Sequence, residues 1–247
     1  MRDFVIFTFV GFVAQVVDGA LGMAYGVACS SVLLSLGIPP ATASASVHAA
    51  EVFTTGASGL AHWRVGNLHK PLLWKLVVPG MVGGAIGAYV LVSTAPQIVK
   101  PLVSAYLGLT GVWILVRAFR VRDREHRLPR GVPVLGFVGG FLDAVGGGGW
   151  GPIVTSTLIG GGAHPRFAIG SVNAAEFFVT VVISATFLFT SSLQVWPIIA
   201  GLLVGGVIAA PIAARLTKRI PEKPLMIIVG LLIIALAVRG IVMVIWP

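Results

Sequence analysis

Two stretches decide the fold of this chain: Asp18-Gly-Ala-Leu-Gly-Met-Ala-Tyr-Gly26 and Asp143-Ala-Val-Gly-Gly-Gly-Gly-Trp-Gly151. They interrupt two long apolar segments, 4–36 and 131–162. A segment of about 30 residues is too long for one straight bilayer crossing and too short for two crossings of ~20 residues each. Glycine weakens a helix by about 1 kcal/mol per residue. We therefore expect each segment to form two half-helices joined by a non-helical tip.

The two stretches occupy equivalent positions of an internal repeat. An ungapped alignment of residues 18–55 with residues 143–180 gives 15 identities, far more than composition alone explains. Rare polar residues match as well as apolar ones: Asp18 with Asp143, Ser46 with Ser171, and Glu51 with Glu176. We predict a first membrane repeat over 1–120, a basic cytoplasmic linker over 121–130, and a second repeat over 131–247.

The composition is that of a protein whose exterior faces lipid. Of the 247 residues, 57% are hydrophobic and only 10% are charged, which leaves too little polar surface for a water-soluble fold. Three further apolar segments follow the broken one in each repeat: 39–62, 71–93 and 98–118, then 165–190, 195–214 and 223–246. The net charge of +9 comes from Lys and Arg in short clusters between these segments. Such clusters indicate membrane topology, and we expect no nucleic-acid partner.

The positions of Lys and Arg predict how the chain crosses the membrane, because the cytoplasmic side collects these residues. If both broken segments are re-entrant, 14 of the 17 Lys and Arg lie on one side and two on the other. Three crossings per repeat is an odd number, so the second repeat is inverted relative to the first. We predict an all-α integral membrane protein with two inverted-topology repeats, each a re-entrant hairpin plus three transmembrane helices.

This topology brings the two glycine-rich tips together near the membrane midplane, where we predict the substrate site. The second half-helix of each hairpin starts at a tip, and its N–H groups and dipole favour an anion. The tip residues expected at the site are Gly22, Tyr25, Gly26, Gly147, Gly148, Gly149, Trp150 and Gly151. Two alternatives stay open: the glycines allow close helix packing, and the two aromatic residues pack in the membrane.

A polar stripe follows each hairpin on the next helix. His48, Glu51 and Thr55 lie at i, i+3 and i+7, and the second repeat places Asn173, Glu176 and Thr180 at the same spacing. We assign four polar residues of these two helices to the substrate site: Ser46, His48, Ser171 and Asn173.

We predict a coupling or structural role for the four intramembrane carboxyls and for Thr55 and Thr180. An ionised carboxylate is costly at this depth. For Glu51 and Glu176, proton coupling, a structural hydrogen-bond network and sodium coordination remain open alternatives. Asp18 and Asp143 are expected to cap half-helices or hold the tips rather than contact an anion, since a carboxylate repels an anion at close range.

The sequence offers no sign of an enzyme. No nucleophile, base and orienting group occur together, so we expect no catalytic activity and no cofactor. The single cysteine, Cys29, cannot form an internal disulfide, and no Cys or His lies at metal-ligand spacing, so we expect no metal site.

Three motifs resemble the TauE/SafE family of sulfite and organosulfonate exporters, and the resemblance spans essentially the whole chain. They are Gly-Gly-Gly-Gly-Trp-Gly-Pro at 146–152, Ile-Gly-Ser-Val-Asn-Ala-Ala-Glu-Phe-Phe-Val-Thr at 169–180, and Ala-His-Trp-Arg-Val-Gly-Asn at 61–67. The resemblance implies secondary transport of sulfite, sulfoacetate or a related sulfur-containing anion out of the cell, across a bacterial-type inner membrane. An anion channel and a carrier for another small organic anion are the alternatives.

The first half departs from the family pattern. Its tip reads Gly-Ala-Leu-Gly-Met-Ala-Tyr-Gly over 19–26, where a triple-glycine run is common in the family. This departure concerns the identity of the anion more than the transport class. The expected partners are a small anionic substrate and membrane lipid.

Overall fold

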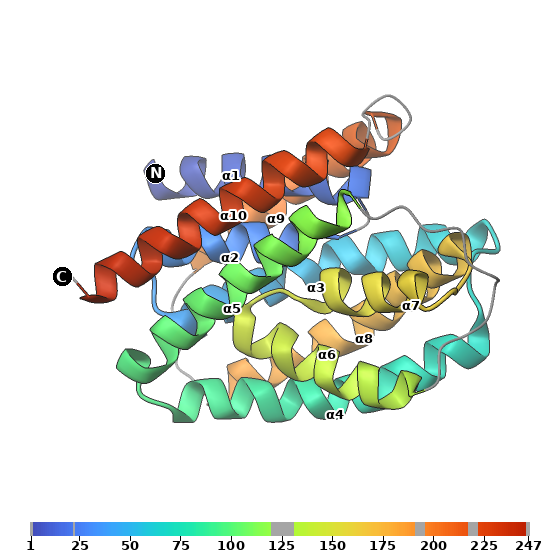
Figure 1. The fold of residues 1–247 in the computed structure, drawn as a ribbon, viewed down its shortest axis with the longest axis horizontal. Helices are drawn as coiled ribbons and strands as arrows, with labels where there is room; N and C mark the ends of the chain where they lie inside the picture. Colours follow the sequence, from blue (N-terminus) through green and yellow to red (C-terminus); the bar gives the residue numbers. More distant parts are fainter. Residues whose placement is uncertain (1, 22, 120–130, 191–195, 217–221, 246–247) are drawn as a thin grey trace.

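The computed structural model describes residues 2–21, 23–119, 131–190, 196–216 and 222–245. These residues form helices and their connections, with no strand among them, which confirms the all-α prediction (Figure 1). The elements are α1 Arg2–Leu21, α2 Tyr25–Ser35, α3 Pro40–Arg64, α4 Lys70–Ser93, α5 Pro96–Arg117, α6 Val132–Gly146, the π-helical turn η1 Gly151–Thr155, α7 Ser156–Gly160, α8 Pro165–Thr190, α9 Trp196–Leu216 and α10 Glu222–Ile245.

Both opening segments are broken at the glycine-rich stretches. The first break separates α1, which ends at Leu21, from α2, which begins at Tyr25. The second separates α6, which ends at Gly146, from η1 and α7. In Figure 1, the second part of each segment runs back toward the end of the molecule from which the first part came. We call α1–α2 the first hairpin and α6–α7 the second hairpin.

The two hairpins end in the same way, through matched glycines. Gly37 and Gly162 adopt φ of +85° and +100°, the left-handed region in which glycine carries no Cβ penalty. The next amide then turns back onto the helix: Ile38 N donates to Leu33 O at 3.1 Å, and Ala163 N donates to Leu158 O at 2.9 Å. The following helices begin at Pro40 and Pro165, where a first turn accepts proline.

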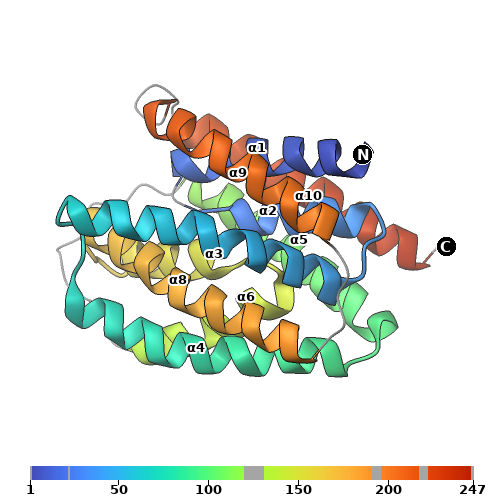
Figure 2. The same cartoon turned by 180° about the vertical axis from the view of Figure 1, so that it is seen from behind.

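The two repeats are interleaved rather than placed side by side as separate bodies. The first hairpin packs through α1 on α9 of the second repeat, and the second hairpin packs through α6 on α4 of the first. Between them, α3 packs on α8 and α5 packs on α10. Figures 1 and 2 show the members of the pairs α3 and α8, and α5 and α10, running in opposite directions. The hydrophobic core is therefore shared by both repeats.

Small residues allow this interleaving. A Cβ added to Gly83 of α4 would lie 2.9 Å from the carbonyl carbon of Phe137 on α6. One added to Gly205 of α9 would lie 2.7 Å from the backbone nitrogen of Phe12 on α1. The same close backbone approach thus occurs twice, at equivalent places, as in other helix pairs that associate within lipid.

The chain is a multi-pass membrane protein. Within the part of the chain that the structure describes, four stretches are long and apolar enough to span a bilayer: Lys70–Ser93, Pro96–Arg117, Arg166–Thr190 and Met226–Met243. The 25 residues of α3 also match the length of a span, but its polar stripe lowers its hydropathy. The described apolar part of α9 is the shorter stretch Trp196–Ala209.

Most of the described cations gather at one end of the bundle. The α3–α4 connection, the α7–α8 connection and the end of α5 lie there, whereas both termini and the α2–α3 and α4–α5 connections lie at the other end (Figure 1). Arg166 at the start of α8 joins two of these connections, because its guanidinium donates to Val65 O at 3.1 Å and to the Asn67 side chain. The placement of these ends relative to a membrane, and the basic linker over 121–130 that lies outside the described residues, stay predictions.

Candidate functional site

The tips of the two hairpins are in direct contact inside the bundle. A Cβ added to Gly26 would lie 2.7 Å from the Cα of Gly148 and 2.8 Å from Oε1 of Glu51. The second tip turns at Gly147 and Gly148, whose φ angles of +67° and +147° favour glycine. Gly22, which we predicted at the first tip, lies outside the described residues.

Side chains of the first repeat hold the second tip. Ser30 of α2 donates a hydrogen bond to Gly147 O. Tyr106 of α5 donates to Gly148 O at 3.3 Å.

We expected the tip glycines to leave open space for an anion against the backbone. In this conformation the space beside Gly148 is instead filled by the backbone of Gly26 and Val27, so close packing is what these two glycines provide here.

A carboxylate lies at the start of each returning half-helix. Oδ1 of Asp18 accepts a hydrogen bond from the backbone N–H of Tyr25 at 3.2 Å. Oδ1 of Asp143 accepts from the backbone N–H of Trp150 at 2.9 Å. The two bonds join equivalent residues of the two repeats, and this is the geometry of a carboxylate that caps a helix. At these two positions, the N–H groups that we expected to face an anion are bonded to the protein's own carboxylates.

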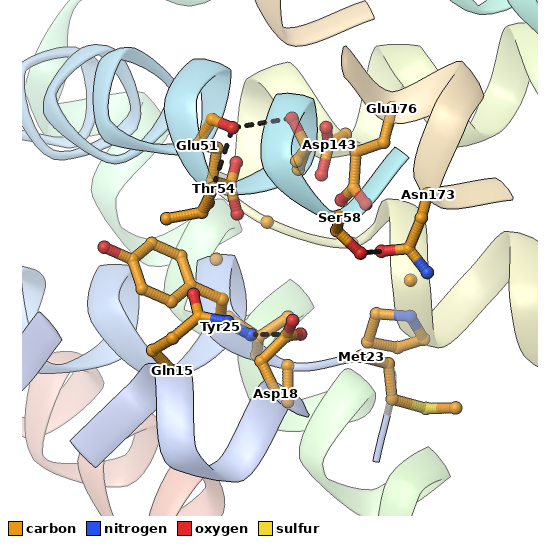
Figure 3. A pocket seen from close by; sticks show the side chains of 18 residues that line it. Gln15, Asp18, Met23, Tyr25, Glu51, Thr54, Ser58, Asp143, Asn173 and Glu176 are labelled. Atoms are coloured by element: carbon orange, nitrogen blue, oxygen red, sulfur yellow. Dashed lines mark hydrogen bonds between the residues drawn. The ribbon is translucent and has the colours of Figure 1, made fainter. Parts of the chain in front are cut away.

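A pocket of about 440 Å³, counting the space open to solvent, lies beside the tips. Four of the eight acidic residues of the chain line it: Asp18, Glu51, Asp143 and Glu176 (Figure 3). The remaining lining residues come from both hairpins and from α3 and α8: Gln15, Met23, Ala24, Tyr25, Gly26, Val27, Thr54, Thr55, Ser58, Gly148, Gly149, Gly151, Pro152 and Asn173.

Glu51 carries a buried carboxyl oxygen that lacks a hydrogen-bond partner among the described residues. The side chain is 3% exposed, and the oxygen without a partner is Oε2. The side-chain oxygen Oε1 of Gln15, 9% exposed, also has none. A buried acceptor without a donor costs about 1–3 kcal/mol. Two such acceptors on one pocket indicate that a proton, cation or polar ligand belongs there.

The polar stripes of α3 and α8 meet across the pocket. Ser58 donates to Oδ1 of Asn173 at 3.3 Å (Figure 3), and Asn173 donates to Ile169 O of its own helix at 2.9 Å. The Thr55 hydroxyl donates to Glu51 O at 2.6 Å, so its hydrogen is used within its own helix.

Several predicted site residues are buried away from the pocket lining. The hydroxyls of Ser46 and Thr180 donate to carbonyls of their own helices, at Thr42 and Phe177. Ser171 accepts from the backbone N–H of His69 at 2.9 Å, which fixes the α3–α4 connection against α8.

Trp150 is a packing residue in this conformation. It is fully buried, its Nε1 donates to Val172 O at 3.1 Å, and it does not line the pocket. A Cβ added to Gly80 of α4 would lie 2.7 Å from the indole ring, so the ring fills the space that this glycine leaves. Its repeat equivalent Tyr25 does line the pocket, and the Tyr25 hydroxyl donates to Leu202 O at 3.0 Å.

His48 contacts the site through a carboxyl rather than through the pocket itself. Its Nε2 lies 3.2 Å from Oδ2 of Asp143, and its Nδ1 lies 2.8 Å from Ser44 O. The pair therefore joins α3 to the second hairpin.

Sequence reasoning missed some residues that line or adjoin the pocket. Thr54 and Ser58 lie three and seven positions after Glu51, so an extension of the polar stripe would have found them. Gln15 lies three positions before Asp18 on α1, but its repeat equivalent is a glycine, which hides it from a repeat comparison. Arg117 donates to Ser156 of the second hairpin and contacts Sδ of Met23 at 3.4 Å. The sequence marks it only when the repeat alignment is shifted by three residues after the matched region, which pairs it with Arg239.

Comparisons with known proteins relate the chain to membrane transporters. The family described as "Sulfite exporter TauE/SafE" matches residues 7–240. The chain is also similar to the "Probable membrane transporter protein YtnM" of Bacillus subtilis (strain 168), with 40% identity over 252 residues that cover 98% of this chain and 84% of that protein. No solved structure matches the chain significantly.

Proposed function

This chain belongs to the sulfite exporter TauE/SafE family, and from that premise we propose that it is a secondary carrier for a small sulfur-containing anion. The substrates in view are sulfite, sulfoacetate and related organosulfonates. The proposed direction is export across a bacterial-type inner membrane.

The observation that carries the proposal is the pocket formed jointly by both hairpin tips. Broken helices that meet between inverted repeats are typical of carriers, whose site is exposed to the two sides in turn. Here each hairpin packs on a helix of the other repeat, so a movement of a hairpin together with that helix would shift its tip relative to α3 and α8.

The carboxyl lining supports coupling to protons. An anion cannot enter a low-dielectric pocket that carries several negative charges, because like charges repel strongly there. It can enter once the carboxyls are protonated. Protons and anion should therefore strengthen each other's binding and move in the same direction. We assign this coupling to Glu51 and Glu176, which face the pocket from α3 and α8.

The number of protons per anion then sets the direction in which the membrane potential drives transport. An interior-negative potential drives anions outward by about 2.3 kcal/mol per charge per 100 mV. If fewer protons than anion charges move together, net negative charge leaves the cell and the potential favours export. If more protons move, the potential favours uptake.

An anion channel is the alternative, and the packing of the tips favours the carrier. A channel needs a continuous path, whereas Gly26 and Gly148 bring the two tips into backbone contact beside the pocket. A carrier should show saturable flux that an anion on the opposite side accelerates.

Purified protein in proteoliposomes allows a direct test, with labelled sulfite and labelled acetate compared as substrates. We expect sulfite counterflow that saturates, and sulfite protection against thermal unfolding that strengthens as the pH falls. Linear flux without counterflow would point to a channel. If sulfite and sulfoacetate give no flux and no thermal protection, the proposed substrate class is rejected.

A further inference from the structure

The pair formed by His48 and Asp143 lies beside the pocket and has a fixed hydrogen-bond geometry. Both side chains are buried, with exposed fractions of 0% for His48 and 1% for Asp143. Nε2 of the imidazole lies 3.2 Å from Oδ2 of the carboxyl. Asp143 lines the pocket and His48 does not, so the pair connects the pocket to the body of α3.

The partner of Nδ1 fixes where one ring hydrogen must be. Nδ1 lies 2.8 Å from the backbone oxygen of Ser44, which can only accept, so Nδ1 carries a hydrogen and donates it. The Ser44 hydroxyl lies 3.2 Å from Nδ1 and gives its own hydrogen to Ala144 O at 2.5 Å. A neutral His48 therefore has a bare lone pair on Nε2.

The carboxyl presents a second lone pair to that nitrogen. Oδ1 of Asp143 is already bonded to the Trp150 N–H, and Oδ2 is the atom that faces Nε2. If His48 were neutral and Asp143 ionised, two acceptors would face each other at 3.2 Å without water. Buried acceptors without a donor are strongly disfavoured. A single proton between the two atoms satisfies both, whether it is assigned to the nitrogen or to the oxygen.

We propose that His48 and Asp143 form a proton-binding site that is filled in this conformation and is distinct from Glu51 and Glu176. The proposal deepens the proposed function, on which its role in coupling rests. The proton ties the second hairpin to α3 through Asp143. When the tip moves away from α3, the two acceptors separate and the proton is free to leave.

Other acidic groups and one aromatic ring lie around the pair. Three acidic groups interact electrostatically with Asp143: Glu51 on α3, Glu176 on α8 and Tyr106 on α5. Asp18 on α1 interacts in turn with both glutamates. On the remaining side, the Phe187 ring of α8 lies 6.4 Å from the imidazole.

The two repeats differ at this site. The repeat equivalents of His48 and Asp143 are Asn173 and Asp18. An amide does not titrate, and Asn173 bonds to Ser58 and Ile169 rather than to Asp18. Only the second hairpin is therefore tied to its neighbouring helix by a proton, and this difference supplies a matched control.

Solid-state NMR on full-length protein in lipid bilayers, with ¹⁵N-labelled histidine, tests the site without any substrate. The His48 signals are identified by their loss in His48→Asn. Near neutral pH we expect either two protonated ring nitrogens or an Nε2 that accepts a strong hydrogen bond from a carboxylic acid. A neutral ring with an unbonded Nε2 in the wild-type protein would overturn the proposal.

Two variants of equal size separate the pair from the rest of the pocket. Asp143→Asn should convert His48 to a neutral ring that accepts from the amide, whereas the repeat-equivalent Asp18→Asn should leave the His48 signals unchanged. An unchanged His48 in Asp143→Asn would refute the pairing.

Transport then tests whether the proton is coupled. In proteoliposomes that show sulfite counterflow, His48→Asn should carry about one proton fewer per anion than the wild type. An unchanged proton count would remove the pair from coupling. If NMR finds the proton but no anion is transported, the site stands and the proposed carrier function fails.

Discussion

Gly26 of the first hairpin and Gly148 of the second meet so closely that a methyl group on Gly26 would lie 2.7 Å from the Cα of its partner. This contact joins the two repeats at the pocket. Gly148→Ala should lower the free energy of unfolding by about 1–3 kcal/mol, because the added methyl meets backbone that cannot yield as a flexible side chain would. Thermal unfolding in detergent measures the effect. Gly160→Ala, where nothing lies within 4 Å of the added methyl, is the control and should match the wild type. Equal stability of the two variants would contradict the contact.

Ala24, at the first tip, adopts a φ of 110°, which side chains rarely occupy. Its repeat equivalent is Gly149. Ala24→Gly removes a buried methyl but also relieves this backbone strain, whereas Ala50→Gly in the middle of α3 removes a buried methyl and weakens a helix. We expect Ala24→Gly to be more stable than Ala50→Gly by about 1–2 kcal/mol. Thermal unfolding of the two variants measures the difference. A smaller loss of stability in Ala50→Gly than in Ala24→Gly would argue against strain at the tip.

Glu51→Gln and Glu176→Gln keep the shape of the side chain and fix it in a neutral form. If these carboxyls couple protons to the anion, transport should lose the part of its pH dependence that the replaced carboxyl carries, while anion binding survives. We expect the larger effect in Glu51→Gln, since Oε2 of Glu51 has no hydrogen-bond partner among the described residues and His48 lies one turn away. Flux measured across a range of pH in proteoliposomes, at fixed membrane potential, reports the change. An unaltered pH profile in both variants would rule out coupling through these residues.

Arg117 places a guanidinium at the junction of the two hairpins, with contacts to Ser156 and to the pocket residue Met23. A cation there should attract an anion on its way to the pocket. We expect Arg117→Gln to raise the half-saturating sulfite concentration by about tenfold, which corresponds to ~1.4 kcal/mol. The repeat-equivalent Arg239 is exposed on α10, so Arg239→Gln should leave that concentration unchanged. Equal effects of the two changes would show that only overall charge matters.

The predicted topology can be tested at two exposed connections. Leu36, 51% exposed, follows α2, and Val65, 61% exposed, follows α3, at opposite ends of the bundle. In a Cys29→Ser background, Leu36→Cys in intact cells should react with an impermeant thiol reagent and Val65→Cys should be shielded. Reaction at Val65 alone would reverse the orientation. Reaction at both would contradict the placement of these connections on opposite sides.

The helices could be predicted from the sequence because strong local signals mark their ends. Proline at 40 and 165 begins helices and glycine at 37 and 162 ends them, so the bounds follow from backbone chemistry alone. The break in each opening segment follows from glycine in the same way. The set of side chains that line the pocket could not be predicted from such local signals, because it depends on which helices pack together.

The convergence of four carboxyls illustrates that limit. Asp18 and Asp143 reach the same pocket only because α1 packs on α9 and α6 on α4, and no local pattern encodes these pairings. The pairing of His48 with Asp143 crosses between repeats, so the helical spacing that groups His48 with Glu51 says nothing of it. The repeat alignment identified both aspartates but left the atoms that they bind unknown.

The interleaving of the repeats also has a consequence during synthesis. The helix that covers α1 is α9, which begins only at Trp196, so the first hairpin emerges from the ribosome long before its neighbour exists. At about 5–20 residues per second, the delay is on the order of 10 seconds or more. During that interval the Asp18 carboxyl and the glycines of the first hairpin lack their packing partner. They must therefore be kept out of the lipid, either by the insertion machinery or by a location at the membrane surface. A chain that stops before α9 would lack the helix on which α1 packs, so the first hairpin completes its packing only after most of the chain has been made.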